Sequence, residues 1–161
     1  MLAKLLRRFN PLPMELAGST LFDEKTFYAA FLKDLEKYHS ELIIESPFIT
    51  YRRLITLLPI LRKLKDHHIR IIVNTRDPLD HDEEWRTDAY LALASLQSIG
   101  VHVIFTAGHH RKLAIIDREV MYEGSLNILS QSTSSEVMRR IESISLAWQM
   151  VRFIELDKLV R

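Results

Sequence analysis

The feature that most constrains this chain is a short apolar run with polar residues fixed at its start. Leu113 to Ile116 is an uninterrupted apolar segment, which is typical of a strand buried on both faces. His110 and Lys112 stand two apart at its mouth. Because residues i and i+2 of a strand point to the same side, the imidazole and the ammonium should project together. Val120 to Tyr122 predicts a second short strand beside the first.

Polar groups also follow the second strand. Gly124 ends it, and Ser125 and Asn127, again two apart, offer a hydroxyl and an amide. A nucleophile candidate, a fixed cation and two neutral hydrogen-bonding groups would then come from adjacent strands. This set suits a phosphodiester, because the cation offsets the phosphate charge and the neutral groups bind its oxygens.

These residues resemble the phospholipase D superfamily, whose pattern is H-x-K, four residues, D, six residues, then G-S and an Asn. The chain gives His110-x-Lys112, four residues, Asp117, six residues and Gly124-Ser125-x-Asn127. The G-S-x-N spacing is closer to the short single-motif nucleases of that superfamily. The resemblance implies a phospholipase D-like fold with one such motif per chain.

Each part of the motif also has an ordinary interpretation. The His109-His110 pair could be a solvated loop or part of a metal site, although ligation by these residues and Asp117 would need a fourth ligand. Lys112 could be a surface lysine, and Gly124-Ser125 a common turn. The whole set at this spacing favours the family instead. We expect no metal and no cofactor, because Lys112 and an amide would supply the charge stabilisation that Mg²⁺ provides elsewhere.

The resemblance implies that His110 attacks phosphorus and forms a phosphohistidine intermediate. Lys112 would supply the cation, and Asn127 and Ser125 would donate hydrogen bonds. A second imidazole is then needed to protonate the leaving oxygen. His109 is poorly placed for this, because neighbouring strand residues point to opposite faces. We therefore expect a homodimer in which two His110 side chains face each other across a twofold axis, as in single-motif members of the superfamily.

Two further residues complete the expected motif. The resemblance implies that a carboxylate near position 136 accepts the ring N–H of the nucleophile, which makes Glu136 a candidate for this role; otherwise it is a surface glutamate. Asp117 lies seven residues after His110, which at ~3.3 Å per residue is about 20 Å along an extended strand. That distance favours a structural role for Asp117, and Gly124 is grouped with it as structural.

Composition limits the compartment and the partners. The chain of 161 residues suits a single domain over 1–161, with 1–19 an uncertain lead that could form a short helix. It has no cysteine and no apolar run near the roughly 20 residues that span a bilayer, so a cytoplasmic location is expected. With a net charge of +1, binding to nucleic acid would need local basic groups. The substrate-binding candidates are Arg111, Arg139 and Arg140, and residues 62–70 form another basic stretch.

Periodicity predicts strands that alternate with helices early in the chain and cluster late, which indicates an α/β fold with a mixed sheet flanked by helices. Glu45 interrupts an apolar run and is interpreted as an edge or solvent-facing position. Acidic residues around His81 are interpreted as the start of a helix capped by Asp82 rather than as a metal site. The expected strands are 42–46, 69–74, 101–105, 113–116, 120–122 and 136–142; the expected helices are 24–39 with Asp23 as N-cap, 51–66 kinked or interrupted at Pro59, 83–98, and a last helix capped by Ser143 or Ser145.

The expected function is a metal-independent nuclease that acts on DNA or RNA. Lipid phosphodiesterase activity is the first alternative, because a headgroup diester has the same chemistry. A catalytically silent nucleic-acid-binding or dimerisation module is the second. No sequence-reading motif is visible, so any specificity would come from a helicase or DNA-binding module in cis or in trans.

Overall fold

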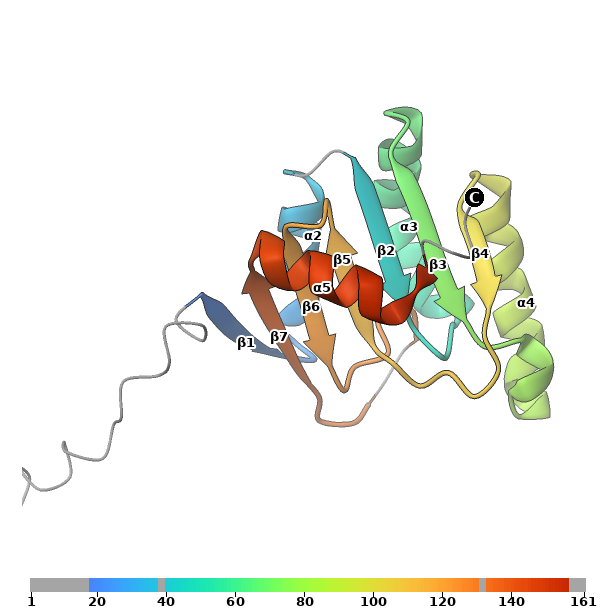
Figure 1. Cartoon of the computed structure of the whole chain (residues 1–161). Helices are drawn as coiled ribbons and strands as arrows, with labels where there is room; N and C mark the ends of the chain where they lie inside the picture. The colour runs from blue at the N-terminus through green and yellow to red at the C-terminus, as the bar shows by residue number, and fades with distance from the viewer. Residues whose placement is uncertain (1–17, 38–39, 131–132, 157–161) are drawn as a thin grey trace, which may run out of the picture.

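The computed structural model describes residues 18–37, 40–130 and 133–156 (Figure 1). Its centre is a seven-stranded sheet in the order β1-β7-β6-β5-β2-β3-β4. The expected lead over 1–19 lies almost wholly outside the described residues, since only Gly18 and Ser19 are included. The strands are β1 Ser19–Asp23, β2 Glu41–Glu45, β3 Arg70–Thr75, β4 His102–Phe105, β5 Leu113–Ile116, β6 Val120–Gly124 and β7 Val137–Glu142.

The sheet is mixed, as expected. Strands β2, β3 and β4 are parallel to one another, whereas β5 runs antiparallel to β2 and continues into the antiparallel series β5, β6, β7 and β1. The carboxyl ends of β2, β3, β4 and β6 therefore meet the amino ends of β5 and β7 at one end of the sheet, the lower end in Figure 1. We call this the His110 end of the sheet, because it carries the loop before β5.

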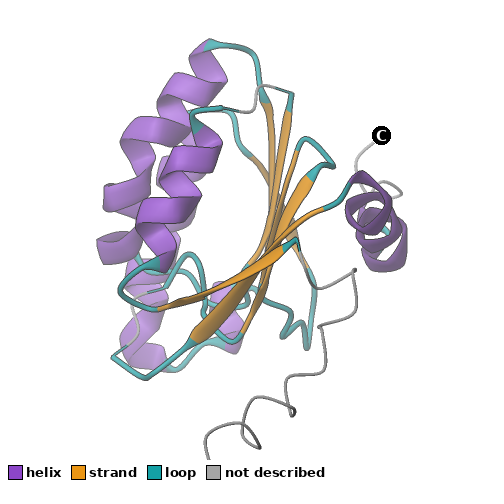
Figure 2. Cartoon of the chain, turned by 90° about the vertical axis from the view of Figure 1, so that its left-hand side faces the viewer, coloured by secondary structure: helices purple, strands orange, loops and turns teal. Residues whose placement is uncertain are grey.

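Helices cover both faces of the sheet (Figure 2). Helices α2 (Phe27–Leu35), α3 (Tyr51–Asp66) and α4 (Glu83–Ser98) lie on one face, and α5 (Ile144–Ile154) crosses the other. Two hydrophobic clusters follow from strand alternation: Ile44 and Ala114 pack under the three helices, while Ile43 and Ile115 pack toward α5. The predicted α/β architecture is confirmed. Within the described residues, no helix is long and apolar enough to cross a bilayer.

The structure corrects several expectations at the start of the chain. Asp23 does not cap the first helix but ends β1, where its carboxylate accepts hydrogen bonds from the backbone N–H groups of Lys25 and Thr26. Helix α2 is accordingly shorter than predicted, with Thr26 at its N-cap. Strand β1 was not anticipated; it pairs only with β7, more than a hundred residues later in the chain.

Other expectations were closer to the observed elements. Helices α3 and α4 have the predicted bounds, and Ser143 caps α5 by accepting a hydrogen bond from Leu146 N. Of the two outcomes expected at Pro59, a kink or an interruption, the interruption does not occur, because α3 continues through this residue. A short 3₁₀ helix, η3 (Pro78–Asp80), precedes α4.

Candidate active site

The His110–Lys112 pair lies in the loop before β5, at the His110 end of the sheet. His110 is exposed, and the Lys112 Nζ lies 3.1 Å from His110 Nδ1 and 3.4 Å from Nε2. Lys112 Nζ also donates to the carbonyl of His110 at 3.0 Å. Strand alternation does not orient these two side chains as expected, because β5 begins only at Leu113. The two side chains nevertheless meet, since Lys112 folds back over the loop.

The neighbouring His109 points inward. It is 6% exposed, its Nε2 lies 3.3 Å from the carbonyl oxygen of Asn74, and its Nδ1 accepts a hydrogen bond from Arg111 N. Burial is the main reason that the pKa of His109 is lowered, although the charge of Glu45 acts in the opposite direction. The side chain therefore fixes the loop from beneath while His110 faces solvent.

Glu45 is the residue that sequence reasoning misjudged most. It is fully buried in the central strand β2, not at an edge. Its carboxylate accepts hydrogen bonds from Arg111 Nε at 2.5 Å, Arg111 Nη2 at 2.8 Å and Asn74 Nδ2 at 2.9 Å. The available signal was the position of an acid inside an apolar run, since a buried carboxylate must be paired.

These contacts anchor the loop on both sides of His110. His109 rests on the backbone of Asn74, and Arg111 is held by Glu45. Thr106, at the start of the loop, donates its hydroxyl proton to Asn74 Oδ1 at 2.9 Å. His110 is therefore the exposed residue between two anchored neighbours, an arrangement that limits how far its ring can move.

Gly124 and Ser125 bring the end of β6 close to β7. A Cβ at Gly124 would lie 2.0 Å from the carbonyl oxygen of Val137, so only glycine fits there. Ser125 N donates to Val137 O at 2.9 Å, and Ser125 Oγ accepts from Val137 N at 3.0 Å. Gly124 N also donates to the carbonyl of Lys112 at 3.3 Å, which ties the end of β6 to the loop before β5.

The remaining polar candidates lie beyond β6. The Oδ1 of Asn127 is buried and has no hydrogen-bond partner among the described residues. Glu136 accepts hydrogen bonds from Ser125 Oγ and, at 2.5 Å, from Ser134 Oγ. The expected bond from the ring of His110 to Glu136 is not present, because the ring nitrogens of His110 lie against Lys112. Burial lowers the pKa of Lys112, and the negative charge of Glu136 partly opposes this.

Asp117 lies at the opposite end of β5, in the turn before β6. Its Oδ1 accepts hydrogen bonds from Ser40 N, Ser40 Oγ and Glu41 N at 2.7 to 2.9 Å. Both Asp117 and Arg118 have positive φ angles, 52° and 57°. The carboxylate therefore stabilises a tight turn far along the strand from His110.

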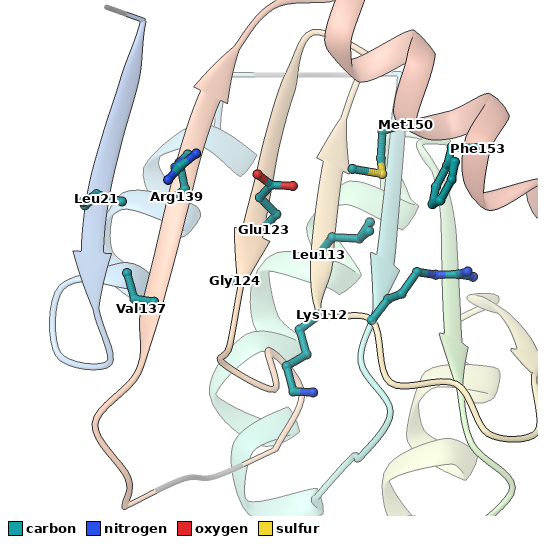
Figure 3. A pocket seen from close by; sticks show the side chains of 10 residues that line it. Leu21, Lys112, Leu113, Glu123, Gly124, Val137, Arg139, Met150 and Phe153 are labelled. Atoms are coloured by element: carbon teal, nitrogen blue, oxygen red, sulfur yellow. The ribbon is translucent and has the colours of Figure 1, made fainter. Parts of the chain in front are cut away.

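A groove of about 450 Å³ adjoins Lys112 on the face that α5 covers only in part (Figure 3). Arg111 and Arg139 both line it. Arg140 does not: its guanidinium faces the other side of the sheet, where it donates to Asp34 at 2.5 Å and to Glu142 at 3.0 Å. The groove also has exposed apolar side chains, namely Leu21, Val137 and Phe153.

The second basic stretch, residues 62–70, lies at the end of α3 and the start of β3. This is the end of the sheet opposite the loop before β5 (Figure 1). Within the described ranges, no group of three His, Cys, Asp or Glu side chains is arranged to hold a metal ion.

Comparison with known proteins places this geometry in context. The family model described as "Cardiolipin synthase, PLD-like domain" matches residues 31–155. No curated protein shows a significant match to the chain.

Solved structures with low sequence identity share the fold. Nuc from Salmonella typhimurium, a phospholipase D family member, has a TM-score of 0.68 at 12% identity, covering 84% of this chain and 90% of Nuc. NucT from Helicobacter pylori has a TM-score of 0.67 at 15% identity, covering 85% of this chain and 92% of NucT. TrmBL2, an archaeal chromatin protein with a novel mode of DNA binding, has a TM-score of 0.61 at 14% identity, covering 97% of this chain but 58% of TrmBL2.

Proposed function

This chain belongs to the phospholipase D-like family, and we propose on that premise that it is a metal-independent nuclease acting on DNA or RNA. The observation that carries the proposal is the exposed imidazole of His110, which lies 3.1 Å from the ammonium of Lys112 at the His110 end of the sheet. Fold similarity to Nuc and NucT supports a phosphodiesterase. The DNA binding of TrmBL2, which shares the fold, supports a nucleic-acid partner.

The proposed reaction has two steps. The neutral imidazole of His110 attacks phosphorus, the bond from phosphorus to the leaving oxygen breaks, and a phosphohistidine forms. Water then attacks the same phosphorus, releasing His110 and the phosphate product. Lys112 offsets the charge on the phosphoryl oxygens throughout, and the Asn127 amide donates a further hydrogen bond. Ser125 acts mainly by holding Glu136 and the start of β7 in place.

A second acid–base group is needed opposite His110, and His109 is turned away into the core. We propose that His110 of the partner subunit supplies it in a homodimer, first giving a proton to the leaving oxygen and then taking one from water. The exposed apolar residues of the groove that Lys112 also lines support such an interface: Leu21 is 63%, Val137 48% and Phe153 73% exposed.

The same apolar side chains favour one alternative, hydrolysis of a lipid phosphodiester, since acyl chains could lie along them. A silent nucleic-acid-binding module is the other alternative. A helicase or DNA-binding partner, in cis or in trans, would supply any sequence specificity, because the sequence contains no recognisable base-reading motif.

The test incubates the full chain with plasmid, single-stranded DNA, RNA and phospholipid vesicles in excess EDTA. We expect nucleic acid to be cleaved, and His110→Ala to lose at least about a hundredfold in rate. His102→Ala is the matched control, because His102 is an exposed histidine on β4 away from the motif. Cleavage only of vesicles would favour the lipid alternative, and DNA binding without turnover would favour the silent module.

The dimer is tested separately. Sedimentation should give a dimer, and Val137→Asp should dissociate it and remove activity together. Full activity in a monomer would contradict the shared site.

A further inference from the structure

A second cavity lies at the His110 end of the sheet and takes no part in the proposed reaction. Its volume is about 220 Å³. Its walls come from the loop between β2 and α3, the segment between β3 and α4, and the segment after β6. The lining residues are Phe48, Ile49, Thr50, His81, Asp82, Trp85 and Ser130.

The most informative atom of this cavity is Nε2 of His81. The residue is 4% exposed, and its Nε2 has no hydrogen-bond partner among the described residues. Burial, followed by the charge of Arg76, lowers the pKa of His81, while a hydrogen bond to the carbonyl of Pro47 acts the other way. A buried ring nitrogen without a partner is costly unless a ligand in the cavity that His81 lines forms a hydrogen bond with it.

Aromatic rings surround this nitrogen. The ring of Phe48 lies 5.2 Å from that of His81, centre to centre, and the Arg76 guanidinium lies 5.6 Å from the Phe48 ring. Trp85, in the first turn of α4, lines the same cavity and is 52% exposed. An exposed indole beside a ring-lined hollow offers a surface on which a planar aromatic ligand can stack.

Size and charge limit what could occupy the cavity. A volume of about 220 Å³ is below the roughly 300–1,000 Å³ of sites for larger ligands, so it suits one small ring system. The carboxylate of Asp82 lines the cavity, where it would repel a phosphate and accept hydrogen bonds, whereas Arg76 is not among the lining residues. A flat aromatic ring that carries an N–H donor therefore fits these groups. Every nucleobase meets this description.

The cavity is connected to the candidate active site through short contacts. Ser130 lines it, and Ser130 N donates to the carbonyl of Asn127 at 3.0 Å. Arg76 follows Asn74 by two residues on the same strand end, and the carbonyl of Asn74 contacts His109. A strand with its diester at His110 could therefore place a neighbouring base here.

We propose that this cavity binds one nucleobase of the strand whose diester is cleaved, by stacking on Trp85 and forming a hydrogen bond with His81 Nε2. The proposal rests on the proposed nuclease function. It predicts a preference for nucleic acid over lipid diesters without selection of one base, because each base has at least one N–H donor.

Tryptophan fluorescence tests the proposal without requiring turnover. The chain has two tryptophans, so in a His110→Ala background Trp148→Phe leaves Trp85 as the only indole. Trp85→Phe is the matched control, because it leaves Trp148, which is 44% exposed on α5 beside the guanidinium of Arg118. Each variant is titrated with a deoxyadenosine trinucleotide and with the same sugar–phosphate trimer lacking its bases.

We expect saturable quenching of Trp85 by the deoxyadenosine trinucleotide and little change at Trp148. The abasic trimer should bind at least about fivefold more weakly, as expected for one lost stacking contact. His81→Phe keeps a ring against Phe48 but removes the ring nitrogens, and should also weaken binding by about fivefold. Equal affinities for the two trimers, or equal quenching in the two single-tryptophan variants, would overturn the proposal.

The outcome is separable from that of the proposed function. If wild-type protein cuts oligonucleotides but Trp85 does not respond, the base site is wrong and the nuclease assignment stands. If Trp85 responds and no diester is cut, the base site stands and the nuclease assignment fails.

Discussion

The pairing of Arg111 with Glu45 makes a prediction with an unusual asymmetry. The Glu45 side chain is 0% exposed, whereas that of Arg111 is 42% exposed. Removing the arginine strands a carboxylate in the core with Asn74 as its remaining donor. Removing the acid instead leaves a cation that already reaches water. We therefore expect Arg111→Ala to destabilise the protein more than Glu45→Gln does.

The expected magnitudes follow from these environments. A buried charge left without its partner costs about 3–5 kcal/mol, which we expect for Arg111→Ala. In Glu45→Gln, the amide oxygen can still accept a hydrogen bond and the half-exposed Arg111 stays hydrated, so the cost should be about 1–2 kcal/mol. Combining the two substitutions removes the stranded charge, and the double variant should be more stable than Arg111→Ala alone by about 2 kcal/mol.

Urea unfolding followed by far-ultraviolet circular dichroism measures all three free energies. Arg52→Ala is the matched control, since Arg52 is an exposed arginine on α3, and it should change stability by no more than about 0.5 kcal/mol. The reasoning is refuted if Arg111→Ala costs no more than Glu45→Gln, or if the double variant is the least stable of the three. Because Arg111 follows His110 directly, Glu45→Gln should also lower the cleavage rate while the protein remains folded.

Three further predictions concern residues around the site and at its far end. Gly124→Ala would put a Cβ 2.0 Å from the Val137 carbonyl oxygen and should cost at least about 2 kcal/mol in urea unfolding, whereas Gly18→Ala, whose Cβ would lie 3.8 Å from its nearest neighbour, should be nearly neutral. Asp117→Ala removes three hydrogen bonds from the turn after β5 and should lower the free energy of unfolding by about 2–3 kcal/mol. The cleavage rate per folded molecule should stay unchanged, because the turn lies at the opposite end of the sheet from His110. A loss of cleavage rate in folded protein would contradict this. Burial, the largest single influence, raises the pKa of Asp34, but hydrogen bonds led by that from Arg140 outweigh it and the net pKa lies below the unfolded value of 3.8. Its stabilisation is therefore present above that value and is lost as the pH falls through the folded pKa, so the stability of an Asp34→Asn variant should depend less on pH between about 5 and 2 than that of wild type, as measured by thermal unfolding.

Much of the fold was predictable from local sequence. The run Leu113 to Ile116 is strand β5 with the expected bounds, because four apolar residues between polar ones must be buried on both faces. Helices α3 and α4 were equally clear, since their apolar stripes recur at helical spacing. Strand β1 gave no such signal: it is an edge strand with mostly exposed side chains, formed by pairing with β7.

The candidate site divides in the same way. Its residue types and spacing were legible in sequence. The opposite directions of His109 and His110 were also expected, but from strand alternation, whereas both residues lie in the loop before β5. The neighbours Arg139 and Arg140 had to face opposite sides of a strand, but sequence did not say which side is the groove. Arg139 lines it, and Arg140 pairs with Asp34 across the sheet.

Sequence by itself determined which groups are present, how they are spaced, and which segments must be buried, because hydrophobic periodicity and motif spacing are local properties of the chain. Tertiary structure alone decided that Glu45 holds Arg111, that the ring of His110 lies on Lys112 instead of bonding to Glu136, and that His81 keeps an unpaired nitrogen beside Trp85. Apart from the His110–Lys112 pair, which lies within one loop, those contacts join residues from different strands and loops, and their geometry exists only once the sheet has brought these segments together.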